Sequence, residues 1–270
     1  MNQDQVKERL LQIEDDVEEF FLVFSGKASK KVNGLYHPDS REIIIHNRNF
    51  ENDDALMYTA IHEFAHHVHF TTSPVPVGPR AHTIEFRSIL HRLLARAEEI
   101  GVYNSPFESD PKIMGLTYRI RTEFLERNGE LMKQFGSVLQ EAEQLCRERG
   151  ARFEDYLERV LHLDRRSATT LMRIASYDID PSIGYQNMAT LASIRNDAER
   201  QEALSKFQAG ESADSVKSTL RAAKHQESVD PLEELEKERR RIQRTIESLE
   251  SKLGAVERRI LSLGGETLEQ

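Results

Sequence analysis

Two histidines and a glutamate in the first third of the chain have the spacing of a metal site. His62, Glu63 and His66 form an H-E-x-x-H motif inside the segment 60–67. On a helix, side chains four residues apart lie on one face, so both imidazoles can bind one Zn²⁺ ion. Glu63 is then next to a zinc-activated water, as its general base. The pattern predicts a peptide-bond hydrolase that holds one zinc ion per chain.

A catalytic zinc site needs a third protein ligand and an open fourth position. Two candidates follow the motif at the start of the next expected helix, His82 and Glu85. We favour His82, because a neutral imidazole suits zinc. Glu85 remains the alternative third ligand.

Apolar spacing predicts the elements that position these residues. Asn52, Asp53 and Asp54 precede a helix expected over 53–70, and the proline-rich loop 71–80 separates it from a second helix over 82–100. A further helix is expected over 5–19, followed by strands over 20–24, 32–36 and 42–46, the last two as a hairpin. One helix, a small sheet and two helices form a compact α+β unit. His67 and His69 point away from the face of the motif and are expected to be exposed or to support the ligands.

This unit resembles the SprT-like family of zinc metallopeptidases over roughly residues 20–95. The matching residues are His62, Glu63, His66, His82 and Phe86. The resemblance implies a zincin-like fold with His82 as third ligand, whereas Glu85 would make the site gluzincin-like. Thr83 departs from the family, since a glycine commonly follows the third histidine there. The cysteine-built zinc ribbon of many relatives is also absent, because Cys146 is the one cysteine.

Length and charge divide the chain further. A chain of 270 residues exceeds the usual size of one domain. The net charge of −9 argues against nonspecific nucleic-acid binding by the whole molecule. The segment 1–110 holds 18 acidic and 11 basic residues, whereas 111–226 holds 17 and 18. With no apolar run near 18 residues and no signal-peptide pattern, the protein is expected in the cytoplasm and not in a membrane.

The second segment is expected to be a helical domain over 112–226. Helices over 153–161 and 165–176, around a break at 162–164, outline a helix-turn-helix at 153–176. The second helix carries residue types that contact phosphates and bases: Arg165, Arg166, Ser167, Thr169, Thr170 and Arg173. This region resembles the DNA-binding part of ParB/KorB-type proteins, which implies duplex DNA as a partner of 111–226. An arginine-bearing helical bundle that binds protein, or binds nothing, is the alternative, and the near-neutral charge of the segment is the strongest point against DNA.

The last segment, 230–264, has the heptad pattern of a coiled coil. Apolar residues and Arg239 occupy the a positions 232, 239, 246, 253 and 260, and apolar residues occupy the d positions 235, 242, 249, 256 and 263. We expect a homodimer through this helix, with packing back onto the helical domain as the alternative. The N-terminal domain is expected to end near residue 105.

Together these patterns predict a zinc metallopeptidase that cleaves a protein or peptide substrate on or near DNA. The alternative is a DNA-binding regulator, or a plasmid or phage accessory protein. Its zincin domain would then be a sensor or would cleave a single repressor, as ImmA/IrrE-type proteins are thought to do.

Overall fold

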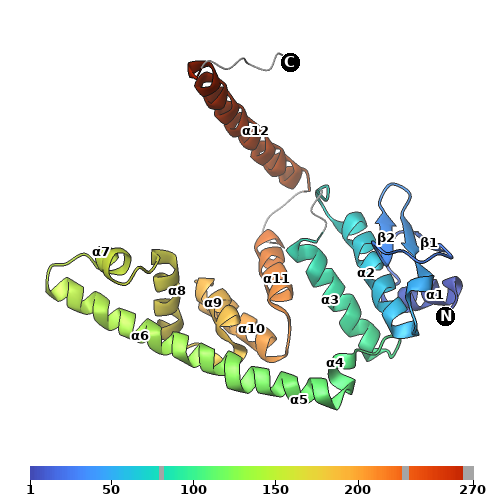
Figure 1. Ribbon diagram of the computed structural model, residues 1–270, viewed down its shortest axis with the longest axis horizontal. Helices are drawn as coiled ribbons and strands as arrows, with labels where there is room; N and C mark the ends of the chain where they lie inside the picture. Colours follow the sequence, from blue (N-terminus) through green and yellow to red (C-terminus); the bar gives the residue numbers. More distant parts are fainter. Residues whose placement is uncertain (79–81, 227–230, 264–270) are drawn as a thin grey trace.

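The computed structural model describes residues 1–78, 82–226 and 231–263, so the end of the loop 71–80 and both ends of the segment 230–264 lie outside it. The described chain is mostly helical, with a small mixed sheet near the N-terminus (Figure 1). Within these residues no helix is long and apolar enough to cross a membrane.

Three short strands form the sheet: β1 (Phe21–Phe24), β2 (Gly34–His37) and β3 (Glu42–Ile45). The strand order is β1-β3-β2, with β1 parallel and β2 antiparallel to β3. The expected hairpin is therefore confirmed. In this sheet β2 is an edge strand that pairs with β3, and it lies beside α2.

Two helices carry the motif and its candidate third ligands. The helix α2 (Asp53–Thr72) begins where the Asn52 side chain accepts a hydrogen bond from the Ala55 amide. The helix α3 (Ile84–Glu99) begins after Thr83, whose hydroxyl accepts from the Phe86 amide. Thr83, the residue that departs from the family pattern, is therefore the N-cap of α3. His82 lies just outside the helix that was expected to include it.

The first helix is shorter than the predicted 5–19. The helix α1 (Gln3–Ile13) ends before the acidic run Glu14-Asp15-Asp16. Carboxylates at a helix C-terminus face the negative end of the helix dipole, which disfavours extension through this run. The following residues lead directly into β1.

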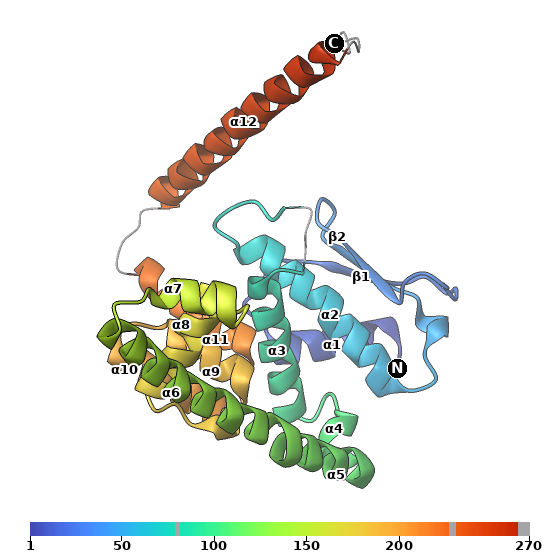
Figure 2. The same ribbon diagram turned by 60° about the vertical axis from the view of Figure 1, so that its left-hand side comes forward.

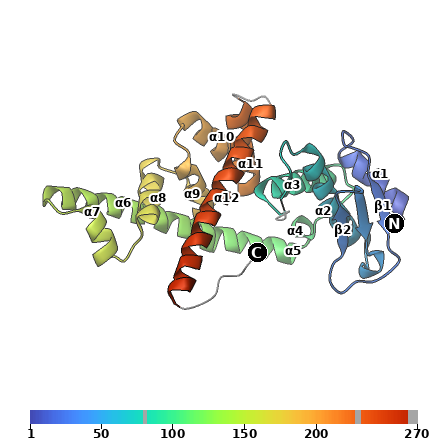
Figure 3. The ribbon, with the colours of Figure 1, turned by 90° about the horizontal axis from the view of Figure 1, so that it is seen from above.

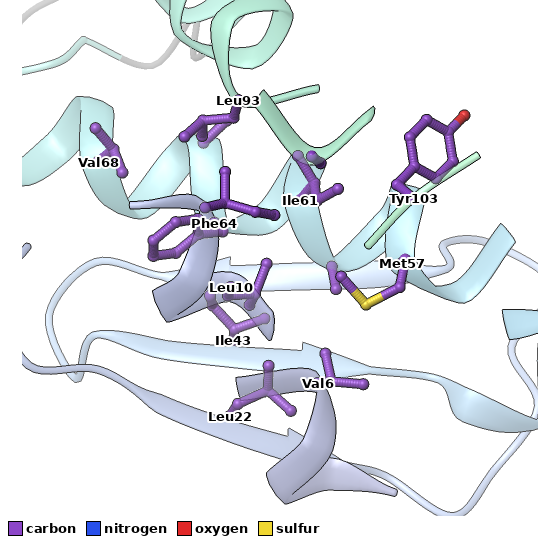
Figure 4. Close-up of a cluster of buried hydrophobic side chains, with 14 of the residues drawn as sticks. Val6, Leu10, Leu22, Ile43, Met57, Ile61, Phe64, Val68, Leu93 and Tyr103 are labelled. Carbon is purple, nitrogen blue, oxygen red and sulfur yellow. The ribbon is translucent and has the colours of Figure 1, made fainter. Parts of the chain in front are cut away.

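A single hydrophobic core joins these elements. It includes Leu10 of α1, Ile43 of β3, Phe64 of α2 and Leu93 of α3, all fully buried, and it ends at Tyr103 (Figure 4). In Figure 4 Phe64 and Met57 of α2 lie towards Leu10 and Ile43, while Leu93 lies above them on the side of α3. The helix α2 is thus buried on most of its surface, and the side chains of its H-E-x-x-H motif have little freedom to move.

Past Tyr103 the chain is helical. A short helix, α4 (Pro106–Ser109), is separated by the extended Asp110 from a continuous helical run. This run consists of α5 (Pro111–Arg119), the π-helical segment η2 (Ile120–Glu126) and α6 (Arg127–Glu148). The remaining elements are the 3-10 helices η1 (Asn47–Asn49) and η4 (Pro181–Ile183), α7 (Phe153–Asp155), the π-helical η3 (Tyr156–Val160), α8 (Arg165–Ser176), α9 (Tyr185–Ser193), α10 (Asp197–Gln208) and α11 (Ala213–Gln226). Seen from above, α7 and α8 lie towards one end of the α5–α6 rod and the sheet towards the other (Figure 3).

Two smaller cores hold the helical region together. One lies between α6 and α8 and includes Leu139 and Leu171, and the other gathers α8 to α11 around Met188 and Leu191. The helix α6 approaches α8 closely at Gly136, where an added Cβ would lie 2.1 Å from the Leu171 carbonyl oxygen. The helix α11 lies beside α3 and so connects the helical region with the N-terminal unit (Figure 1).

The long helix α12 (Pro231–Ser262) extends away from the other elements (Figure 2). Its apolar heptad side chains are exposed, among them Leu235, Ile242, Leu249 and Leu253. The described part of this helix therefore presents an apolar stripe to solvent.

Candidate metal centre

His62, His66 and His82 converge on one point. The Nε2 atom of His82 lies 3.2 Å from Nε2 of His62 and 3.2 Å from Nε2 of His66. Among the described residues these three form a group whose ligand atoms all lie within 4.8 Å of one another. The motif histidines come from successive turns of α2, and His82 comes from the segment just before α3.

The spacing of these nitrogens fits a zinc ion. Ligands about 2.0–2.1 Å from a tetrahedral zinc are separated from one another by about 3.3 Å. Hydrogen bonds explain the arrangement less well, because His82 Nε2 has either one hydrogen or one lone pair and cannot bond both neighbours. The donor set therefore suits a shared cation better than a hydrogen-bonded network.

Phe86 supports all three imidazoles from the first turn of α3. Its ring is buried, and its centroid lies 4.1 Å from that of His66, 4.8 Å from that of His82 and 5.2 Å from that of His62. This contact gives a physical reason for the spacing of four residues between His82 and Phe86. An apolar ring under the ligands restricts their rotation and excludes water from one side.

Glu63 lies beside the histidine group and is 7% exposed. Burial raises the pKa of its carboxyl group to about 7. Gly34 of β2 faces it so closely that a Cβ there would lie 2.8 Å from Glu63 Cγ. Sequence reasoning missed Gly34, although a lone glycine in a strand is a signal of such a close approach.

Burial also keeps the two motif histidines, His62 and His66, neutral. It lowers the pKa of His66 to about 3, with further lowering from the neighbouring His62, His82 and His69. It also lowers the pKa of His62, with a smaller contribution from His82. Neutral imidazole is the form that binds metal, so His62 and His66 need lose no proton to bind an ion at neutral pH.

An open cavity of about 480 Å³ leads to this group. Edge strand β2 and its flanks form one wall and α2 the other; the lining residues are Val32, Asn33, Gly34, Leu35, Tyr36, Pro38, Tyr58, Thr59, His62, Glu63, His66, Phe70 and His82. A second cavity of about 650 Å³ shares Asn33, Tyr58 and Thr59 with it and continues towards Asp54 and Tyr103.

The other histidines of α2 are buried, which corrects the expectation that they could be exposed. His67 is completely buried between α2 and the sheet. Its Nδ1 lies 3.1 Å from the Tyr36 hydroxyl and its Nε2 lies 2.8 Å from the Glu18 carbonyl oxygen. His69 is also buried, and its Nδ1 is a buried polar atom without a hydrogen-bond partner among the residues that the structure describes. The sequence identified the helix face that carries His62 and His66. It could not show that His67 and His69 are also buried, because α2 is enclosed on most sides.

Glu85 does not belong to the three-residue group. It lies in the first turn of α3. Burial lowers the pKa of the nearby His69, and the charge of Glu85 opposes part of that shift. The geometry thus favours His82 over Glu85 as third ligand.

The six residues predicted to contact DNA all lie on one helix, α8. A helical turn over 153–160 precedes a break at 161–164 and then α8, close to the expected bounds. Arg165, Arg166 and Thr169 are exposed, while Ser167, Thr170 and Arg173 are half-buried. Arg165 donates to Glu158 at 2.6 Å, and the two threonine hydroxyls donate to backbone carbonyls of their own helix. These residues share a surface, but part of their hydrogen-bonding capacity is already used.

Comparison of the chain with known protein families, curated proteins and solved structures finds no match.

Proposed function

We propose that this chain is a zinc-dependent metallopeptidase of the SprT-like kind. The observation that supports it most is the convergence of three imidazole nitrogens next to a buried carboxyl group, in a cavity open to solvent. His62, His66 and His82 would hold the ion. Zinc supplies a Lewis acid to such a site.

Glu63 is the residue that moves protons in this proposal. A carboxyl group with a pKa of about 7 exchanges a proton readily near neutral pH. Glu63 takes a proton from a water molecule in the cavity and later delivers it to the leaving amine. Phe86 and the wall formed by Gly34 hold the histidines and Glu63 in place during both steps.

The architecture is consistent with this proposal. A small sheet packed on the H-E-x-x-H helix, with an edge strand lining the cavity, is the arrangement expected of a zincin-like domain. The core of this unit ends at Tyr103, next to the proposed domain boundary near residue 105. We further propose that the exposed stripe of α12 forms a coiled coil with a second copy.

Metal analysis and a Glu63 variant test the proposal. The purified chain should contain about one zinc per molecule. It should cleave members of a mixed peptide library, and mass spectrometry detects the cleavage products. Glu63→Gln should retain zinc and lose hydrolysis by about 10²- to 10⁴-fold, because only proton transfer is removed. Absence of zinc, or cleavage that survives in Glu63→Gln, would refute the peptidase.

DNA binding by the helical region is a second function that we propose. It is supported by the exposed N-terminal part of α8, where Arg166 and Thr169 stand beside a short break between helices. Such a module would bring the peptidase to a protein on DNA. Alternatively, it would make the metal domain an accessory of a DNA-binding regulator.

A further inference from the structure

One arginine connects the third histidine with the helical region. The Nη1 atom of Arg87 donates a hydrogen bond of 2.9 Å to the backbone carbonyl oxygen of His82. The Nε atom of the same guanidinium donates to Oδ2 of Asp214 at 2.5 Å. Asp214 lies in the first turn of α11, 127 residues later in the chain.

His82 needs such a support more than the other two histidines. His62 and His66 belong to the buried helix α2, whose backbone hydrogen bonds fix the main chain that carries both side chains. His82 is exposed and precedes Thr83, the N-cap of α3, so its carbonyl group takes no part in the helix. The bond from Arg87 holds this carbonyl and thereby the position from which the imidazole reaches the site.

Asp214 determines where the guanidinium lies. An arginine presents its donors in one rigid plane, so a bond at Nε also fixes the direction of the other nitrogens. The position of Asp214 depends in turn on α11, whose Val216 is fully buried in the core of the helical region. A second contact, between His91 Nδ1 and the Ser212 hydroxyl at 2.8 Å, fastens the start of α11 to α3.

We infer that Arg87 is a positioning residue for the metal ligand His82 and that Asp214 of α11 holds Arg87 in its working orientation. This inference rests on the proposed function, because it assigns His82 to a metal ion. Its consequence is a coupling between the helical region and the metal centre. Whatever displaces α11 from α3 weakens zinc binding, and zinc binding stabilises the contact of α11 with α3 by the same factor.

Zinc affinity of the full chain, measured by competition with a chromogenic chelator, tests this coupling. Asp214→Asn should weaken zinc binding about three- to tenfold. This loss is at or below the smallest one expected for a residue that supports a metal ligand, because the Arg87–Asp214 ion pair is partly exposed. Arg87→Ala should have at least the same effect. Adding Asp214→Asn to Arg87→Ala should change nothing further, since Asp214 acts through Arg87.

Two control variants separate this role from a general loosening of the structure. Glu99→Gln removes a carboxylate that pairs with Arg96 on the same helix at 2.6 Å, without touching His82. His91→Ala removes one exposed hydrogen bond between α3 and the start of α11, while the packing of the two helices and both bonds of Arg87 remain. Both should bind zinc as the unmodified chain does.

The outcomes distinguish the inference from the function on which it depends. An unmodified chain that binds no zinc overturns the metal centre and this inference together. An unmodified chain that binds zinc, with Asp214→Asn binding equally well, overturns the inference alone, as does an equal loss in His91→Ala. If Asp214→Asn fails to fold, Arg87→Lys gives the same test, because lysine keeps the charge but cannot make both bonds in one plane.

Discussion

Gly34 and Glu63 both line the cavity and lie so close to each other that no methyl group fits between them. A Cβ on Gly34 would lie 2.8 Å from Cγ and 3.0 Å from Oε1 of Glu63. It would also lie 3.0 Å from Cγ2 of Thr59. The wall of β2 therefore determines how far the carboxyl group can turn away from the histidines.

Gly34→Ala should consequently impair hydrolysis while leaving the metal in place. The added methyl group pushes the Glu63 side chain away, and a displacement near 1 Å costs up to about 100-fold in rate. Zinc content should stay near one per chain, because the three atoms nearest to the added Cβ belong to Glu63 and Thr59 and not to a histidine. The peptide-library assay and metal analysis measure the two effects separately. Gly115→Ala, with nothing within 4 Å of the added atom, is the control; equal activity of both variants would contradict the role of this wall.

The second prediction concerns the ligand set. His62→Ala, His66→Ala and His82→Ala should each strip most of the zinc, because each removes one of three converging nitrogens. Glu85→Ala should retain it, since Glu85 is outside the group. Metal analysis after dialysis measures the outcome. Retention in His82→Ala together with loss in Glu85→Ala would transfer the third position to Glu85.

The motif residues could be predicted from the sequence, because a spacing of four converts directly into one face of a helix. His82 could be proposed from its distance to Phe86, and the structure explains that distance by stacking under the ligands. Burial of His67 and His69 could not be predicted, since helical periodicity assumes one solvent face and α2 is enclosed on most sides. The link from Arg87 to Asp214 left no local signal, because 127 residues separate its ends.

The third prediction concerns the contact of α6 with α8. Gly136→Ala should lower the free energy of unfolding by about 1–3 kcal/mol, because the new Cβ would lie 2.1 Å from a backbone oxygen that cannot easily move. Gly115→Ala, in the exposed helix α5, should instead raise it by about 0.5–1 kcal/mol. Denaturant unfolding followed by circular dichroism compares the two. Equal denaturation midpoints for the two variants would contradict this prediction, because they would show that α6 and α8 can move apart without a loss of stability.

The fourth prediction tests the stripe on α12. Leu249 is 59% exposed at a d position, and we expect it to be covered by a second copy in solution. Leu249→Lys should therefore convert a dimer into a monomer, because a charge would be buried in the seam. Ser251→Lys, two residues away on the outer face, should leave the dimer intact. Light scattering gives the masses, and identical masses for both variants would exclude this seam as the dimer contact.

The last prediction is that the helical region binds duplex DNA through α8. Arg166 is exposed and lies at the start of that helix, whereas Arg165 already donates to Glu158. Arg166→Ala should weaken binding of the full chain to a mixed DNA pool at low ionic strength. It should also reduce the slope of log affinity against log salt by about one, the value for one phosphate contact.

Arg147→Ala is the matched control, because Arg147 lies on α6 and pairs with Glu143. Leu249→Lys should lower the affinity further, since a monomer presents one near-neutral module instead of two. If the DNA shows no electrophoretic retardation, or a retardation that does not depend on salt, the helical region is a protein-interaction bundle. The peptidase proposal would stand in that case, because none of the metal-centre residues belongs to α8.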